Sequence, residues 1–417
     1  MLKRIDSTYR EYPKPFWVIT GATFVDRLGG TLIFPFFSLY ITQKFGVGMT
    51  EAGVLFGIWA VAGLVGQILG GALTDRFGRK PIVLFGLIFS ALSSISMGLV
   101  EQLSTFYVLA AIVGLLSDIS FPAYQAMIAD LLPEEKRADG FGITRVAANL
   151  AWVAGPMIGG LLAAQSFLLL FVLDAISSLI TAAIVYFFVP ETKPEQEEGA
   201  ESQTMVSTLK GYGQVATDRL FVAFVVTAMV MTLVYLQLYS SLPVYLRDVH
   251  SVPARGYGLL MSLNALTVVI FQFWITRRTN RYPPMLMMAL GTVLYMIGFT
   301  TYGFGSTFMV FLIAMLVVTF GEMIVIPVSQ ALAARFAPED KRGRYMAFFG
   351  FAWMGPSIFG HAAAGLIMDN YDPRWVWYLG GILSAIAVAG FLVLHAKTQE
   401  RFPPKIEEMP QAAMENA

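Results

Sequence analysis

The sequence contains no cysteine and few charged residues. Without cysteine there are no disulfides and no thiol chemistry, so cysteine usage says nothing about the redox compartment. Only 13% of the 417 residues are charged and 56% are hydrophobic, whereas about a quarter of a soluble domain is charged. These proportions exclude an ordinary soluble domain and indicate a protein that crosses the lipid bilayer many times.

Histidine is also scarce, with three residues in the whole chain. There is no phosphate-binding Walker loop and no plausible Ser/His/Asp or metal-ligand constellation. We therefore expect no enzyme, no catalytic residue, no metal site and no cofactor. The formal net charge is zero, and we expect no nucleic-acid partner.

The N-terminus lacks a cleavable signal pattern, because no short apolar stretch precedes a small-residue cleavage site. The first apolar run is long and should remain as a membrane helix. Crossing a bilayer takes about 20 apolar residues, and twelve segments meet that length, which predicts an all-α fold. They lie near residues 16–42, 50–74, 81–100, 104–132, 138–163, 166–189, 220–246, 255–276, 284–304, 306–335, 343–368 and 374–397.

One connection is long, and it divides the chain. Residues 190–219 begin with an acidic stretch that lacks apolar periodicity, which predicts a cytoplasmic linker with a short surface helix at 205–217. The domains are then a six-helix half at 1–189, the linker, a second six-helix half at 220–397 and a cytoplasmic tail at 398–417.

The two halves carry related sequences. Residues 121–137 and 326–342 share eight identical residues at a constant spacing of 205. Pro35 and Pro243 also occupy matching places near the ends of helices 1 and 7. The alternative is two similar membrane-exit turns, which the fixed spacing disfavours. The repeat predicts two pseudo-symmetric halves with a cavity between them.

The positive charges predict the orientation, because Lys and Arg are enriched in cytoplasmic loops. With the N-terminus inside, most bases fall in cytoplasmic segments. The bases left in outside loops are Lys44, Arg247, Arg255 and Arg374. Both termini should therefore be cytoplasmic, in a multi-pass protein of the cell's inner (plasma) membrane.

Residues 71–81, GALTDRFGRKP, join two long apolar runs at a membrane surface. They resemble the loop 2–3 motif of the major facilitator superfamily, G-x-L-x-D-R-x-G-R-K, at every position. The resemblance extends over nearly the whole chain and implies a cytoplasmic gate that latches the halves in the outward-facing state. The alternative is a simple positive-inside anchor. The gate residues would be Gly71, Asp75, Arg76, Gly78, Arg79 and, as the acid that receives the loop arginine, Asp130.

Helix 5 is similar to the motif G-x8-G-x3-G-P-x2-G-G of proton-coupled antiporters. Ala151 replaces the second glycine, and ordinary small-residue packing is the alternative explanation. The resemblance implies a seal between the halves. The arginine that drug antiporters often carry before Gly114 in helix 4 is missing, so coupling residues cannot be transferred from the family. The matching residues are Gly142, Gly155, Pro156, Gly159 and Gly160.

Ionisable residues inside membrane spans are functional candidates by default. Glu322 is the leading candidate for proton coupling, because no base lies within three turns of it on its own helix, and Asp26 is second. Two alternatives stay open: Asp118 and Arg145 form a structural pair, or His361 is a neutral packed residue. Asp174, on a peripheral helix, is expected to be structural. The coupling candidates are Glu322, Asp26, Asp118, Arg27, Arg145 and His361.

The rest of the expected cavity is aromatic and neutral, which suits lipophilic cations through cation–π contacts. We interpret the chain as a monomeric, proton-driven exporter of drugs or other lipophilic or cationic small molecules, similar to bacterial multidrug antiporters. The alternatives are a proton-coupled symporter for a nutrient such as a sugar, and a non-transporting receptor of the same fold. The cavity candidates are Tyr235, Tyr239, Gln237, Asn149, Trp152, Asn264 and Trp353.

Overall fold

A computed structural model describes residues 11–117, 119–193, 213–338, 341–399 and 401. Within these residues the regular elements are helices, and 12 segments are long and apolar enough to cross a membrane. The predicted all-α fold and number of spans are therefore confirmed. Most of the predicted linker helix at 205–217 and most of the tail at 398–417 lie outside the described residues.

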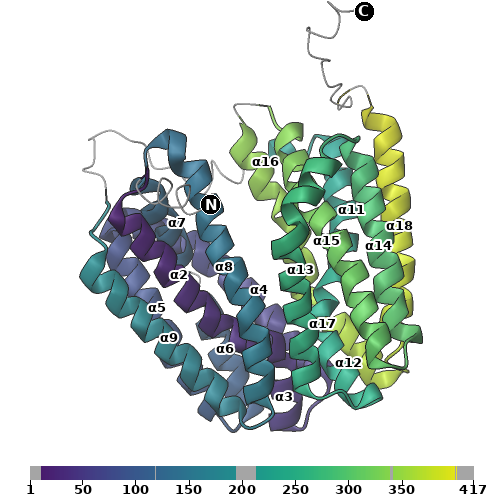
Figure 1. The fold of residues 1–417 in the computed structure, drawn as a ribbon, viewed down its shortest axis with the longest axis horizontal. Coiled ribbons are helices and arrows are strands. Elements are labelled where there is room, and N and C mark those ends of the chain that lie inside the picture. Colours follow the sequence, from purple (N-terminus) through teal and green to yellow (C-terminus); the bar gives the residue numbers. More distant parts are fainter. Residues whose placement is uncertain (1–10, 118, 194–212, 339–340, 400, 402–417) are drawn as a thin grey trace, which may run out of the picture. The chain divides into compact units, whose positions relative to one another are not determined.

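The first six spans comprise nine helical elements (Figure 1). They are α2 (Lys14–Ile33), η1 (Phe34–Phe36), α3 (Phe37–Phe45), α4 (Met49–Phe77), α5 (Arg79–Leu99), α6 (Leu103–Ser117), α7 (Ser120–Asp130), α8 (Glu134–Ala163) and α9 (Phe167–Phe188).

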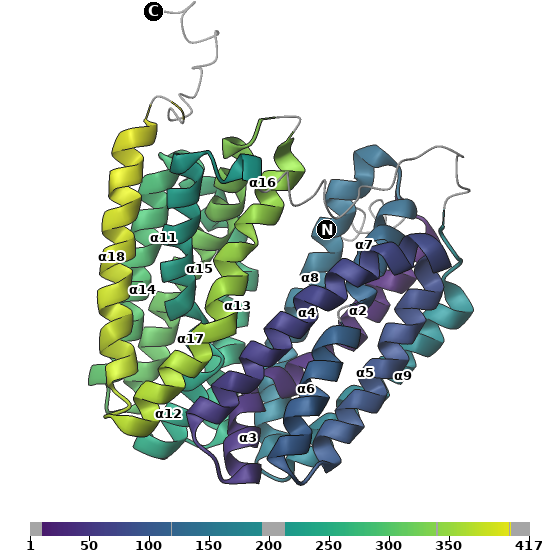
Figure 2. The ribbon, with the colours of Figure 1, turned by 180° about the vertical axis from the view of Figure 1, so that it is seen from behind.

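The last six spans comprise a further nine (Figure 2). They are α11 (Arg219–Tyr235), η2 (Leu236–Leu238), α12 (Ser241–His250), α13 (Ala254–Thr279), α14 (Pro284–Phe304), α15 (Phe308–Phe336), α16 (Arg342–Phe349), α17 (Phe351–Asn370) and α18 (Trp375–Thr398).

Spans 1 and 7 are each interrupted by a short 3-10 turn near a proline. Pro35 lies within η1, and Pro243 is the third residue of α12, just after η2. Proline has no backbone N–H, and its ring clashes with the carbonyl four residues earlier, so it disfavours a regular α-helix in the preceding turn. The interruption separates Tyr235, which ends α11, from Tyr239, which follows η2. The span predicted at 220–246 is therefore not one continuous α-helix.

The chain forms two compact units. Unit 1 comprises Met1–Ser202, Leu236–Val269 and Ser357–Trp375. Unit 2 comprises Gln203–Tyr235, Ile270–Pro356 and Val376–Ala417. Unit 1 thus contains the first six spans together with α12 and parts of α13 and α17. The predicted boundaries of the two sequence halves remain a prediction.

Unit 1 is built around α2, which packs against α8 and α9, while α9 also packs against α5 (Figures 1 and 2). Fully buried apolar side chains fill this region, among them Phe16, Ile19 and Met127. In unit 2, α14 packs closely on α15, where a Cβ on Gly291 would lie 2.5 Å from a Val325 methyl. Small residues allow this approach, and helix pairs in lipid depend on such packing.

The glycines of the helix 5 motif differ in how tightly they are packed. A Cβ on Gly155 would lie 1.9 Å from Oγ1 of Thr31 on α2, and one on Gly160 would lie 2.9 Å from the Ala254 carbonyl oxygen. Nothing lies within 4 Å of the corresponding position at Gly142. Ala151, the departure from the motif, is fully buried, and its carbonyl accepts a hydrogen bond from Thr31 at 3.2 Å. Close contact is therefore confined to the C-terminal part of the motif.

We predict that Gly155→Val destabilises the protein by roughly 1–3 kcal/mol, the usual cost of overpacking a close-packed interior. Gly142→Val is the matched control, because it places the same side chain on the same helix in open space. Thermal unfolding of the two variants in the same detergent measures the difference. Equal midpoints for the two variants would show that the α2–α8 contact is not close-packed in the membrane.

Candidate transport cavity and gating loop

Two adjoining cavities of about 410 and 480 Å³ lie within unit 1. Asp26, Arg27, Ser90 and Ser117 line both of them. Asp26 and Arg27 come from the middle of α2, and Ser90 comes from α5. The shared lining places an acid, a base and hydroxyl groups together in the interior of a membrane-spanning bundle.

The first cavity combines a charged end with aromatic side chains. Trp152 on α8, one of the residues expected in the substrate cavity, lines it. Its ring packs edge-on against Tyr239 at 5.8 Å between centroids, and Phe34 contacts both rings. The aromatic residues that line the cavity are Phe34, Phe37, Phe56, Trp59 and Trp152.

Asp174 on α9 also lines the first cavity. The sequence predicted a structural residue on a peripheral helix and did not predict this position in the cavity. Its side chain is buried, and Ser94 on α5 donates a hydrogen bond to it. Ser178, one turn further along α9, lies beside Asp26 and donates a hydrogen bond of 3.4 Å to the Ser90 hydroxyl. The hydroxyl-rich stretch SALSSIS at 90–96 in an otherwise apolar helix is the sequence signal that could have identified this partner.

The remaining charged candidates of the first six spans are Arg27, Arg145 and Asp118. Arg27 lines both cavities, while Arg145 on α8 lines the second. Asp118 is outside the described residues, so its pairing with Arg145 stays a prediction. Asn149, also on α8, is partly buried.

Glu322, the leading candidate from the sequence, is a partly buried residue of α15 in unit 2. The two cavities of unit 1 are not lined by it. Tyr235 and Trp353 are also in unit 2, with their rings 5.8 Å apart between centroids. The residues expected in one cavity are therefore distributed over both units.

His361 belongs to a polar cluster within unit 1. Its Nδ1 lies 2.8 Å from the Ser240 hydroxyl, and its ring packs on Phe56. Ser241 donates a hydrogen bond of 2.7 Å to Oε1 of Gln237, and Gln237 Nε2 donates to the Gly360 carbonyl. This arrangement favours the packed alternative for His361. Asn264 is likewise buried, on α13.

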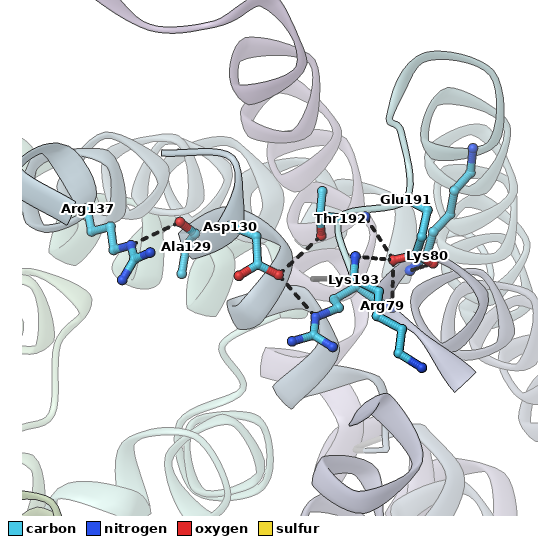
Figure 3. Close-up of polar contacts among 8 residues, drawn as sticks. All are labelled: Arg79, Lys80, Ala129, Asp130, Arg137, Glu191, Thr192 and Lys193. Carbon is cyan, nitrogen blue, oxygen red and sulfur yellow. Dashed lines mark hydrogen bonds and ion pairs between the residues drawn. The ribbon is translucent and has the colours of Figure 1, made fainter. Parts of the chain in front are cut away.

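The gating loop at the α4–α5 junction is held from α7 (Figure 3). Arg79 donates a hydrogen bond from Nε to Oδ2 of Asp130 at 3.0 Å, in an ion pair. This is the contact expected between a loop arginine and Asp130, although its role as a latch remains a prediction. Arg137 donates to the Ala129 carbonyl at 3.1 Å and so fixes the chain next to Asp130. The side chain of Asp75 is outside the described part of the structure.

Glu191, just after α9, accepts hydrogen bonds from several backbone N–H groups. Those of Arg79 and Lys80, in the first turn of α5, donate at 3.0 and 3.2 Å. Those of Thr192 and Lys193 donate at 2.8 and 2.9 Å (Figure 3). Glu191 has no signal in the sequence pattern, because the contact joins residues more than a hundred positions apart.

The need for this carboxylate follows from how α5 begins. Its N-cap residue is Gly78, which has no side chain to cap the helix and has a φ of 97°, a value that favours glycine. A Cβ at Gly78 would lie 2.6 Å from Oε2 of Glu191. The first N–H groups of a helix have no partner within it, and Glu191 supplies one from a distant segment.

These contacts also affect the protonation of Glu191. Burial would raise the pKa of its carboxyl, but the backbone N–H donors outweigh burial and hold the pKa below its ordinary value of 4.5. Because the pKa is lowered in the folded protein, the stabilisation is fully present above pH 4.5 and is lost as the pH falls through the lowered pKa.

Comparison with known proteins agrees with the fold. The family model of the Major Facilitator Superfamily matches residues 19–360 and 239–415. A Na(+), Li(+), K(+)/H(+) antiporter of Planococcus maritimus is 29% identical over 76% of this chain and 80% of its own. The multidrug resistance protein MdtH of Cronobacter sakazakii is 24% identical over 96% of this chain and 98% of its own.

The solved structures are also transporters. The crystal structure of the nucleoside transporter NupG aligns with a TM-score of 0.79 at 13% identity, covering 92% of this chain and 99% of that one. The fold, the number of spans and the matched family model define a membrane transporter rather than an enzyme. The chain belongs to the Major Facilitator Superfamily.

We predict that Glu191→Gln destabilises the protein by roughly 1 kcal/mol at neutral pH, as the loss of a helix cap does. Glutamine keeps the size of the side chain but loses the charge that the helix N-terminus favours. Unfolding midpoints measured across a range of pH should show an acid-induced loss in the wild type that is smaller in the variant. Glu135→Gln, at an exposed position of α8, is the control. The same pH profile in wild type and Glu191→Gln would contradict the assignment.

Proposed function

We propose that the protein is a proton-driven antiporter that exports lipophilic or cationic small molecules by alternating access. Asp26 and Asp174 bind the proton in this proposal. The observation that carries it is the first cavity, which is lined by the carboxyl groups of the buried Asp174 and the partly buried Asp26 together with the guanidinium of Arg27. The proton gradient supplies the energy and no cofactor is needed.

The charges of the cavity suggest how protons and cargo would be exchanged. Two ionised carboxyls beside one arginine leave an excess negative charge, which is costly in a low-dielectric interior. Either a proton or a cationic substrate would neutralise it. Because both would use the same carboxyls, binding of one should release the other, which is the requirement for antiport.

The hydroxyl groups around the acids suit a group that changes its protonation state. Ser94 contacts Asp174, and Ser178 contacts Asp26. A hydroxyl donates to a carboxylate, and after rotation it accepts from a carboxylic acid. Both forms of Asp174 therefore keep a hydrogen-bond partner, as a reversible proton carrier requires, and Ser178 places a second hydroxyl beside Asp26.

The aromatic residues of the cavity support a lipophilic cation as cargo. The faces of Trp and Phe rings attract cations, most strongly when water is excluded. Phe34, Trp59 and Trp152 line the same cavity as the two acids. The similarity to the multidrug resistance protein MdtH of Cronobacter sakazakii points in the same direction.

An inorganic monovalent cation is the second candidate cargo. The relative from Planococcus maritimus is named a Na(+), Li(+), K(+)/H(+) antiporter. Carboxylate and hydroxyl oxygens, which Asp26, Asp174 and Ser94 provide, are the ligands that hard cations prefer. The same carboxyls would then exchange a metal ion, rather than an organic cation, for protons.

We predict that Asp26→Asn and Asp174→Asn each reduce proton-coupled transport to background, because each removes one exchangeable carboxyl. The assay uses proteoliposomes with an acidic lumen and a luminal pH dye, in which antiport of added cation alkalinises the lumen. Glu101→Gln, at an exposed position between α5 and α6, is the control. Glu322→Gln tests the alternative assignment.

Wild-type rates in both Asp26→Asn and Asp174→Asn would contradict the proposal. If Glu322→Gln shows background rates while Asp26→Asn and Asp174→Asn transport normally, the proton site is on α15. Acidification instead of alkalinisation would indicate symport, and no flux with any cargo would favour the receptor alternative.

A separate prediction concerns the cargo. In the same proteoliposomes, a lipophilic organic cation should alkalinise the lumen, and Trp152→Ala should reduce its apparent affinity by about tenfold through the loss of a cation–π contact. Na⁺, Li⁺ and K⁺ should be weak by comparison. If the metal ions drive alkalinisation and Trp152→Ala leaves it unchanged, the second candidate is correct.

A further inference from the structure

Asp369, near the end of α17, makes an unusual contact with the start of α4, although some 320 residues separate them in the sequence. Its Oδ1 accepts a hydrogen bond from the Met49 N–H at 2.9 Å. Its Oδ2 accepts from the Thr50 N–H at 2.7 Å and from the Thr50 hydroxyl. One carboxylate thus receives three donors from the first turn of another helix.

The start of α4 needs such a partner. Its N-cap residue is Gly48, which makes no side-chain cap, so the first N–H groups have no partner from their own segment. A carboxylate at this position also interacts favourably with the helix dipole. A Cβ on Gly48 would lie 2.5 Å from the Asp369 carboxylate, so glycine is what permits the approach.

The contact continues along both helices. A Cβ on Gly365 would lie 2.4 Å from the Met49 carbonyl oxygen, and one on Gly57 would lie 2.4 Å from that of Ile358. The backbones of α4 and α17 therefore lie close together over about two turns. Near the same end, Arg247 on α12 donates to the Thr42 hydroxyl on α3 at 3.0 Å.

We infer that Asp369 is a gate residue, a carboxylate clamp on α4 that holds this end of the transporter closed and must release for it to open. The inference rests on the proposed alternating access, in which α4 and α17 belong to different sequence halves. The clamp lies at the N-terminal end of α4 and the Arg79–Asp130 loop lies beyond its C-terminal end, roughly 40 Å away for a helix of this length. The two contacts therefore concern opposite ends of the bundle.

The test uses the natural absence of cysteine. Ala52→Cys introduces a single thiol on α4, at a position that is fully buried. Its labelling rate with a water-soluble maleimide, in purified protein in nanodiscs, reports how often this end opens. In this background, Asp369→Asn should label about tenfold faster, the effect of losing hydrogen bonds to a charged group. Asparagine keeps the size but replaces one acceptor oxygen with a donor.

Asp372→Asn is the matched control, because Asp372 lies just after α17, three residues beyond Asp369, and accepts a hydrogen bond from a local backbone N–H, that of Arg374, at 2.9 Å. It should label at the reference rate. Equal rates in Asp369→Asn and Asp372→Asn would overturn the inference. If Asp369→Asn does not fold, Thr50→Val decides. It removes one donor and should label faster than the reference, and a reference rate would overturn the inference.

The labelling assay requires neither cargo nor a proton gradient. If Asp369→Asn opens the protein but Asp26→Asn transports normally, the result supports the clamp and contradicts the proposed proton site. If Asp26→Asn is inactive but Asp369→Asn labels at the control rate, the result supports the proposed function and contradicts the clamp.

Discussion

The structure depends on how the backbone N–H groups at the helix N-termini are satisfied. A membrane protein cannot leave these groups without partners near hydrocarbon, because each costs several kcal/mol. Both α4 and α5 begin after a glycine that provides no cap. In each case a carboxylate from a distant segment takes that place: Asp369 for α4 and Glu191 for α5. Glycine is needed because the carboxylate occupies the space of a Cβ.

The interior of unit 1 follows a different constraint, the cost of charge. Asp26, Asp174 and Arg27 are brought to one cavity by α2 and α9, which pack tightly through Gly29. A Cβ on Gly29 would lie 2.8 Å from Oδ1 of Asp174, so the small residue sets how closely that acid approaches α2. Serine hydroxyls satisfy the acids without fixing their charge. This arrangement is the basis of the proposed proton exchange.

The sequence predicted the parts that rest on local pattern. Twelve apolar runs predicted the fold, and the match of residues 71–81 to a family motif predicted that a loop arginine meets Asp130, without showing that it is Arg79. It did not predict Glu191, Asp369 or the cavity position of Asp174, because each depends on which helices pack together. Span 7 was also predicted as one continuous run. Apolar periodicity does not show that Pro243 disfavours the helix turn before it. The preference for Glu322 came from counting charges along one helix, and the sequence could not show which acids meet across helices.

The two capping carboxylates differ in what they connect, and this difference assigns their roles. Glu191 joins residues 79 and 191, which both belong to the first predicted half, so its contact can persist while the halves move. Asp369 joins α4 to α17, which belong to different predicted halves, so its contact cannot persist through a change that separates them. Under the proposed alternating access, the same physical interaction would stabilise α5 in every state and α4 only in one of them. A conditional cap of this kind biases the equilibrium between two conformations by as much as it stabilises one of them.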